Sequence, residues 1–119
     1  MKTCRERSWL MPNTRAEALR IVRELHRQLA DFYGERLKGV YLYGSYARGE
    51  ADEDSDIDIA VVLTGPVDEA EEGRRTCDII GDLSLRHNCL IAAFFLSEDE
   101  YRTTPYAIHR SIVREGVPA

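Results

Sequence analysis

The sequence contains no long hydrophobic run. Its longest uninterrupted apolar stretch covers residues 89–96, whereas a helix that crosses a membrane needs about 20 apolar residues. The N-terminus is also unlike a secretory signal, because Arg5, Glu6 and Arg7 precede an apolar stretch of residues 9–11 only. We therefore expect no membrane span and a cytoplasmic location.

Cysteine is scarce as well. The three cysteines, Cys4, Cys77 and Cys89, are widely spaced and form no C-x-x-C pair. This pattern favours free or buried thiols over a disulfide framework or a zinc site.

Positive charge is outweighed by negative charge, with 16 Lys and Arg against 21 Asp and Glu. A net charge of -5 excludes a nucleic-acid binder held by bulk charge. The acidity is concentrated, because residues 49–73 hold ten acidic residues and no Lys or Arg. This one segment therefore needs a specific explanation.

The length fits one domain, and no linker divides the chain, so we expect one domain over residues 1–119 with 1–13 as an N-terminal extension. The first helix is predicted to begin after Thr14, which forms a capping-box pattern with Glu17, and to end near Gly34. Its apolar positions recur at helical spacing: Ala18, Val22, Leu25, Leu29 and Phe32. Its other face carries Arg15, Arg20, Arg23 and Arg27, which a solvated face explains, with a basic docking stripe as the alternative.

The rest of the chain alternates between strand and helix patterns. Short β-branched or apolar runs predict strands at 40–43, 56–63 and 89–96. Helices are predicted over 67–87 and 105–114, and Ser97 with Glu100 repeats the capping-box pattern. This alternation is typical of an α/β domain.

A glycine turn follows the first predicted strand. Gly44 can adopt a backbone conformation closed to other residues, and Ser45 then starts a short helical turn that Gly49 ends. Backbone N–H groups aimed at one point favour a phosphate, and Arg48 could add a charged donor. An ordinary tight turn is the alternative.

Two aspartates open the next predicted strand. Asp56 and Asp58 are two residues apart, so both side chains are expected on one face, about 7 Å apart, with Ile57, Ile59 and Val61 on the core face. Carboxylates this close repel each other unless a cation lies between them, and Mg²⁺ is the expected partner.

The neighbouring acids have a simpler explanation. A calcium-binding loop shares the opening spacing of Asp52, Asp54 and Asp56, but it requires glycine where Ile57 stands and glutamate where Leu63 stands. We therefore expect a solvated loop that contains Glu50, Asp52, Glu53 and Asp54.

Gly44 and Ser45, followed after ten residues by Asp56, Ile57 and Asp58, resemble the signature of the minimal nucleotidyltransferases of the DNA polymerase β-like superfamily. The resemblance implies a small mixed sheet of about three core strands flanked by helices. It implies that Gly44 and Ser45 bind the triphosphate of ATP and that Arg48 joins them, with pairing of Arg48 to the acidic loop as the alternative. It also implies that Asp56 and Asp58 are catalytic and bind Mg²⁺, with a two-ion site left open.

The implied reaction is transfer of AMP from Mg-ATP to a hydroxyl acceptor, with release of pyrophosphate. Active members of the superfamily usually place a third carboxylate on a later strand, but residues 89–96 contain no acid. Asp82, Glu98 and Asp99 lie outside that strand, and His87 is expected to cap a helix. The enzymatic assignment therefore has less support than the binding assignment.

Short relatives of this kind usually act with a separate all-helical partner of the HEPN type. The resemblance therefore implies the antitoxin half of a toxin–antitoxin pair. The alternative is a non-catalytic, partner-binding antitoxin with a vestigial nucleotide site. Nucleic acid is not indicated, and self-association stays open.

Overall fold

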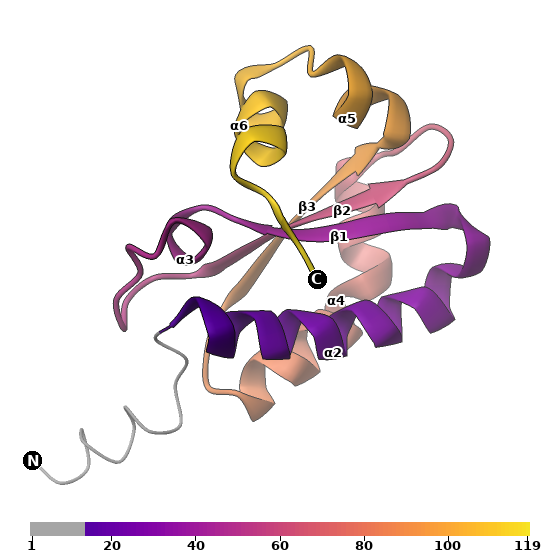
Figure 1. Ribbon diagram of the computed structural model, residues 1–119. Coiled ribbons are helices and arrows are strands. Elements are labelled where there is room, and N and C mark those ends of the chain that lie inside the picture. Colours follow the sequence, from indigo (N-terminus) through magenta and orange to yellow (C-terminus); the bar gives the residue numbers. More distant parts are fainter. Residues whose placement is uncertain (1–13) are drawn as a thin grey trace, which may run out of the picture.

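The protein is described by a computed structural model over residues 14–119 (Figure 1). Cys4 and the expected extension, 1–13, lie outside the described residues. The helices are α2 (Arg15–Tyr33), the 3₁₀ turn η1 (Gly34–Arg36), α3 (Ser45–Arg48), α4 (Glu69–Arg86), α5 (Glu98–Thr103) and α6 (Ala107–Glu115). The strands are β1 (Leu37–Tyr43), β2 (Ile57–Leu63), β3 (Ile91–Ser97) and β4 (Val117–Pro118).

The strands form one mixed sheet in the order β3-β2-β1-β4. β2 runs parallel to β3 and antiparallel to β1, while β4 pairs antiparallel with β1. The predicted α/β fold with a mixed sheet is confirmed. The sheet has one strand more than expected, because two C-terminal residues pair with Tyr41 and Leu42.

Helix α2 matches its prediction at both ends. The Thr14 side chain accepts a hydrogen bond from the Glu17 N–H, and Gly34 ends the helix with a φ of 62°. The apolar stripe ends one residue later than expected, since Tyr33 is buried and Phe32 is 41% exposed. The predicted solvated face is exposed and makes no ion pair within residues 14–119; it consists of Arg15, Arg20, Arg23 and Arg27.

Helices cover both faces of the sheet (Figure 1). Helices α2 and α4 lie on one side, and α5 and α6 lie on the other. Ile57, Ile59 and Val61 join the larger core cluster with residues of α2. We had expected the face of β2 that carries Asp58 to be a carboxylate face. Instead, Ala60 and Val62 are buried on this face, in a second cluster with Ile112 of α6. Asp58 therefore lies at the uncovered end of a face that is otherwise packed.

The remaining boundaries differ from their predictions by a few residues. β1 begins three residues before the predicted strand, and β3 begins two residues later than predicted. Ser97 and Glu100 form the expected capping box at the start of α5. No helix within residues 14–119 is long and apolar enough to cross a membrane.

Candidate functional site

The turn that follows β1 has the predicted geometry. Gly44 has a φ of 78° and a ψ of -155°, a backbone conformation that is essentially restricted to glycine. Helix α3 begins at Ser45, and Gly49 ends it with a φ of 77°. A Cβ atom on Gly44 would overlap the Asp58 Oδ2 atom. The turn and this aspartate are thus in direct contact, and only a residue without a side chain fits between them.

The two aspartates lie at the start of β2. Asp56 is exposed and precedes the first residue of the strand, and Asp58 is the second residue and is half-buried. In the sheet, Asp58 stands between Tyr43 of β1 and Ala92 of β3. The structure therefore brings Gly44 and Asp58 together from separate strands, with Asp56 beside them.

The electrostatic surroundings of the aspartates are unfavourable for two free carboxylates. Burial raises the pKa of Asp58 above its ordinary value, the charge of Asp56 raises it further, and only Arg48 acts in the opposite direction. The pKa of Tyr43 is also raised, to about 12, by burial and then by Asp58, Glu69 and Glu115. Neither Asp56 nor Asp58 forms a side-chain hydrogen bond or ion pair with another residue of 14–119. The pair therefore lacks a direct counter-charge.

A divalent cation fits this donor set. Mg²⁺ is usually held by one or two carboxylates, and water or phosphate oxygens complete its shell. Asp56 and Asp58 meet that requirement for one ion. No group of three or more His, Cys, Asp or Glu side chains able to hold a metal occurs within residues 14–119.

No third carboxylate joins Asp56 and Asp58 in a metal-binding cluster within residues 14–119. Ala92 occupies the β3 position beside Asp58. Two of the acids near this strand in the sequence are paired elsewhere, Asp82 with Arg86 and Asp99 with Arg102. The histidine before the strand, His87, caps α4 as expected and pairs with Glu24.

Arg48 has two acidic partners. Its Nε atom lies 2.9 Å from Glu50 Oε1, and its Nη1 atom lies 3.1 Å from Glu115 Oε1. The same Glu115 oxygen accepts a hydrogen bond from the Gly44 N–H, at 3.2 Å. The Gly44 N–H, one of the groups expected to face a phosphate, is therefore already hydrogen-bonded. Sequence reasoning missed Glu115, because nothing in the local pattern links it to a turn 71 residues earlier.

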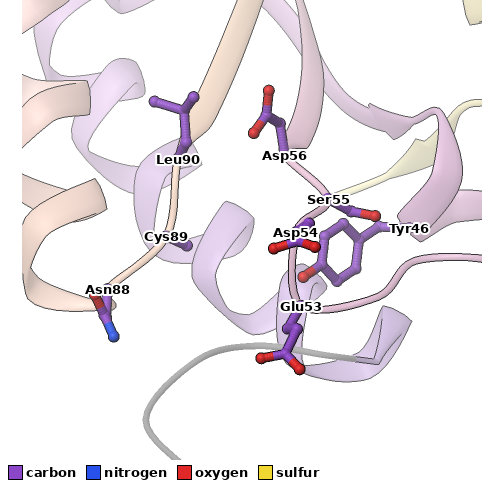
Figure 2. A pocket seen from close by; sticks show the side chains of 8 residues that line it. All are labelled: Tyr46, Glu53, Asp54, Ser55, Asp56, Asn88, Cys89 and Leu90. Atoms are coloured by element: carbon purple, nitrogen blue, oxygen red, sulfur yellow. The ribbon is translucent and has the colours of Figure 1, made fainter. Parts of the chain in front are cut away.

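A small cavity lies beside Asp56, and Tyr46 of α3 forms part of its wall (Figure 2). Its volume is about 260 Å³, which is below the range of about 300–1,000 Å³ typical of small-molecule sites. Its walls come from α3, from the acidic loop and from the segment before β3: Tyr46, Glu53, Asp54, Ser55, Asp56, Asn88, Cys89 and Leu90. Three of these side chains are carboxylic acids, so the cavity would repel a triphosphate that carries no cation.

The fold defines a nucleotidyltransferase-type α/β domain. A structure titled "Structure of putative minimal nucleotidyltransferase" is 27% identical in sequence with a TM-score of 0.55, and the match covers 87% of this chain and 94% of that one. A structure titled "Crystal structure of the toxin-antitoxin with AMP-PNP" matches 80% of this chain and 69% of its own, with a TM-score of 0.57 and 21% identity. This second likeness concerns the fold alone.

The sequence comparisons give the family. Residues 22–113 match the nucleotidyltransferase domain family, and the chain belongs to that family. A protein of Methanocaldococcus jannaschii named "Putative protein adenylyltransferase" is 34% identical over 96 residues, which cover 80% of this chain and 90% of that protein. The predicted family is therefore confirmed.

Proposed function

We propose that the protein binds Mg-ATP and transfers AMP from it to a hydroxyl acceptor. One observation carries this proposal: Asp56 and Asp58 lie together beside the Gly44 turn without a direct counter-charge. A bound cation would relieve both the burial of the Asp58 charge and its repulsion by Asp56. Membership of the nucleotidyltransferase family, and a relative named as an adenylyltransferase, support the same chemistry.

Each residue has a defined part in this proposal. Asp56 and Asp58 hold Mg²⁺, which neutralises triphosphate charge when bound. The Gly44 N–H, the Ser45 end of α3 and the Arg48 guanidinium bind phosphate oxygens. The close contact between Gly44 and Asp58 would bring the phosphates next to the carboxylates.

The reaction is an in-line displacement at the α-phosphate. The acceptor hydroxyl oxygen forms a bond to the α-phosphorus and releases its proton. The bond from the α-phosphorus to the oxygen shared with the β-phosphate breaks, and pyrophosphate leaves. In this scheme the residues of the chain supply positioning and charge stabilisation, and no covalent intermediate forms on the protein.

We also infer a protein partner. The toxin–antitoxin structure with AMP-PNP shares this fold, which supports a role as the antitoxin half of a two-protein system. An all-helical protein of the HEPN type is the partner that the sequence resemblance implies, and a hydroxyl on that partner would be the acceptor.

A second candidate is a partner-binding antitoxin whose nucleotide site is vestigial. The observation in its favour is Ala92, which stands beside Asp58 where a third metal-binding carboxylate would complete a two-ion site. This candidate predicts that the partner is neutralised without nucleotide transfer.

Transfer of label from α-phosphate-labelled ATP to the helical partner tests the two candidates. We expect the wild-type protein to label the partner and Asp56→Asn with Asp58→Asn to leave it unlabelled. A variant with two exposed aspartates changed, Asp31→Asn with Asp78→Asn, controls for the lost charge and should retain transfer. Equal labelling by the wild type and the site variant would refute the enzymatic role of the pair. Absence of labelling by the wild type, with the partner still neutralised, would favour the second candidate.

A further inference from the structure

The carboxylate of Glu115 occupies the donors of the glycine turn. Glu115 Oε1 accepts hydrogen bonds from the Gly44 N–H at 3.2 Å and from Arg48 Nη1 at 3.1 Å. The side chain is only 17% exposed. An anionic group is thus already bound by two of the donors that the proposed function assigns to the triphosphate.

The backbone of Glu115 is held firmly in place. Glu115 is the last residue of α6, and the helix is anchored by Ile112, which is fully buried. The next residue, Gly116, donates its N–H to the Ile112 carbonyl at 2.8 Å, and a Cβ atom on it would lie 3.3 Å from Tyr41 Cβ. β4 then pairs with β1. Departure of the carboxylate from the turn therefore requires rotation of the side chain rather than movement of the backbone.

Both Glu115 and Arg48 have other charged partners when the Glu115 carboxylate is displaced from the turn. The second Glu115 oxygen, Oε2, already lies 3.5 Å from Nη2 of the exposed Arg114. Arg48 also keeps an ion pair with Glu50 when Glu115 moves away. Neither side of the contact is left without a counter-charge.

We propose that Glu115 is an internal competitor for the phosphate donors and that nucleotide binds only after its carboxylate has left the turn. This inference rests on the proposed function. A carboxylate and a phosphate cannot share this part of the turn, because the Gly44 N–H is a single donor already bonded to Glu115 and the two anions would repel each other beside it. The structure therefore represents a nucleotide-excluding state of the site.

An orienting role for Glu115 gives the opposite expectation. If the carboxylate served to aim Arg48 at the phosphates, its removal would weaken nucleotide binding. The Glu50 contact argues against this role, since it already fixes the Arg48 Nε atom at 2.9 Å. The sign of the affinity change therefore separates competition from orientation.

Calorimetric titration with Mg-ATP tests the competition directly. The proteins compared are the wild type, Glu115→Gln, Glu115→Ala and the control Glu98→Gln, which removes one exposed acid from α5 and changes the net charge by the same amount. We expect both Glu115 variants to bind Mg-ATP at least about tenfold more tightly than the wild type, because hydrogen bonds to charged groups are individually strong. Glu98→Gln should match the wild type.

The outcomes separate the inference from the function on which it rests. Equal or weaker binding by both Glu115 variants, with the wild type still binding, would overturn the competition and leave the proposed function standing. Binding by none of the four proteins would refute the proposed function itself, and the inference with it. Thermal unfolding of the same samples shows whether each variant is folded, and Glu115→Ala serves as the second readout if the glutamine amide still bonds to Gly44.

Discussion

Replacing Gly44 by alanine tests the contact that joins the turn to the aspartates. The backbone at this position, with a φ of 78° and a ψ of -155°, is essentially accessible to glycine alone. The added Cβ atom would also overlap Asp58 Oδ2. The substitution thus imposes backbone strain and displaces a carboxylate at the same time.

The expected cost follows from these two effects. A non-glycine residue in this region costs about 1–3 kcal/mol, and forcing an atom into an occupied position adds about 1–3 kcal/mol. Because the Asp58 side chain is only half-buried and can partly yield, we expect Gly44→Ala to lower the free energy of unfolding by about 2–4 kcal/mol. We also expect weaker Mg-ATP binding, since Asp58 would move.

Urea denaturation measures the free energy of unfolding, and two other glycines provide controls. Gly49 has a φ of 77°, but a Cβ atom added there would have only one atom within 4 Å, an Arg15 Nη2 atom at 3.9 Å, so Gly49→Ala should cost only about 1–2 kcal/mol. Gly73 lies within α4 with nothing near it, so Gly73→Ala should stabilise the protein by about 0.5–1 kcal/mol. The reasoning would be refuted if Gly44→Ala were no more destabilising than Gly49→Ala.

Three further predictions concern charge and packing. Asp58→Asn should raise the melting temperature at pH 7, because the pKa of Asp58 is raised in the folded protein and its charged form opposes folding there. The folded state binds this proton more tightly than the unfolded chain, so the advantage of the variant should shrink as the pH falls through the raised pKa; an advantage independent of pH would contradict this cause. Glu72→Gln should destabilise the protein by about 1–3 kcal/mol in urea, because this buried carboxylate receives hydrogen bonds from Tyr33, Arg36 and Arg75. A loss of stability below about 0.5 kcal/mol, as is usual for substitutions of exposed residues, would show that the hydrogen bonds to Glu72 do not stabilise the fold. Ile112→Ala should lower the free energy of unfolding by about 2–5 kcal/mol, because this side chain of α6 is fully buried. A loss below about 0.5 kcal/mol, as is usual for an exposed residue, would show that α6 does not pack on the sheet as described.

Much of the fold could be predicted from local sequence signals. α2 was predictable because Thr14, Glu17 and Gly34 mark its ends and its apolar residues follow the helical period. The start of β1 was not, because Lys38 and Gly39 resemble a loop, although they belong to the strand. β4 consists of two residues, one of them proline, so its pairing depends on tertiary contacts that no local pattern records.

The site was predictable only in part, for a related reason. The glycine turn and the aspartate pair are local motifs, so their spacing indicated their geometry. Glu115 reaches the turn from the end of α6, and such a long-range contact depends on how α6 packs on the sheet. The sequence could have indicated that the face of β2 carrying Asp58 is buried further along the strand. Residues 59–63 are all apolar, and strands buried on both faces lose the alternation of apolar and polar residues.

Calorimetric titration of the wild-type protein with Mg-ATP, repeated with Asp56→Asn and Asp58→Asn combined, tests the central claim most directly. The account predicts saturable binding by the wild type and a loss of affinity of at least about 100-fold in the double variant, because two charged contacts are removed. The control, Asp31→Asn with Asp78→Asn, should bind as the wild type does. Binding of equal strength by the wild type and the Asp56 and Asp58 double variant would contradict the claim that these two carboxylates form a cation and nucleotide site.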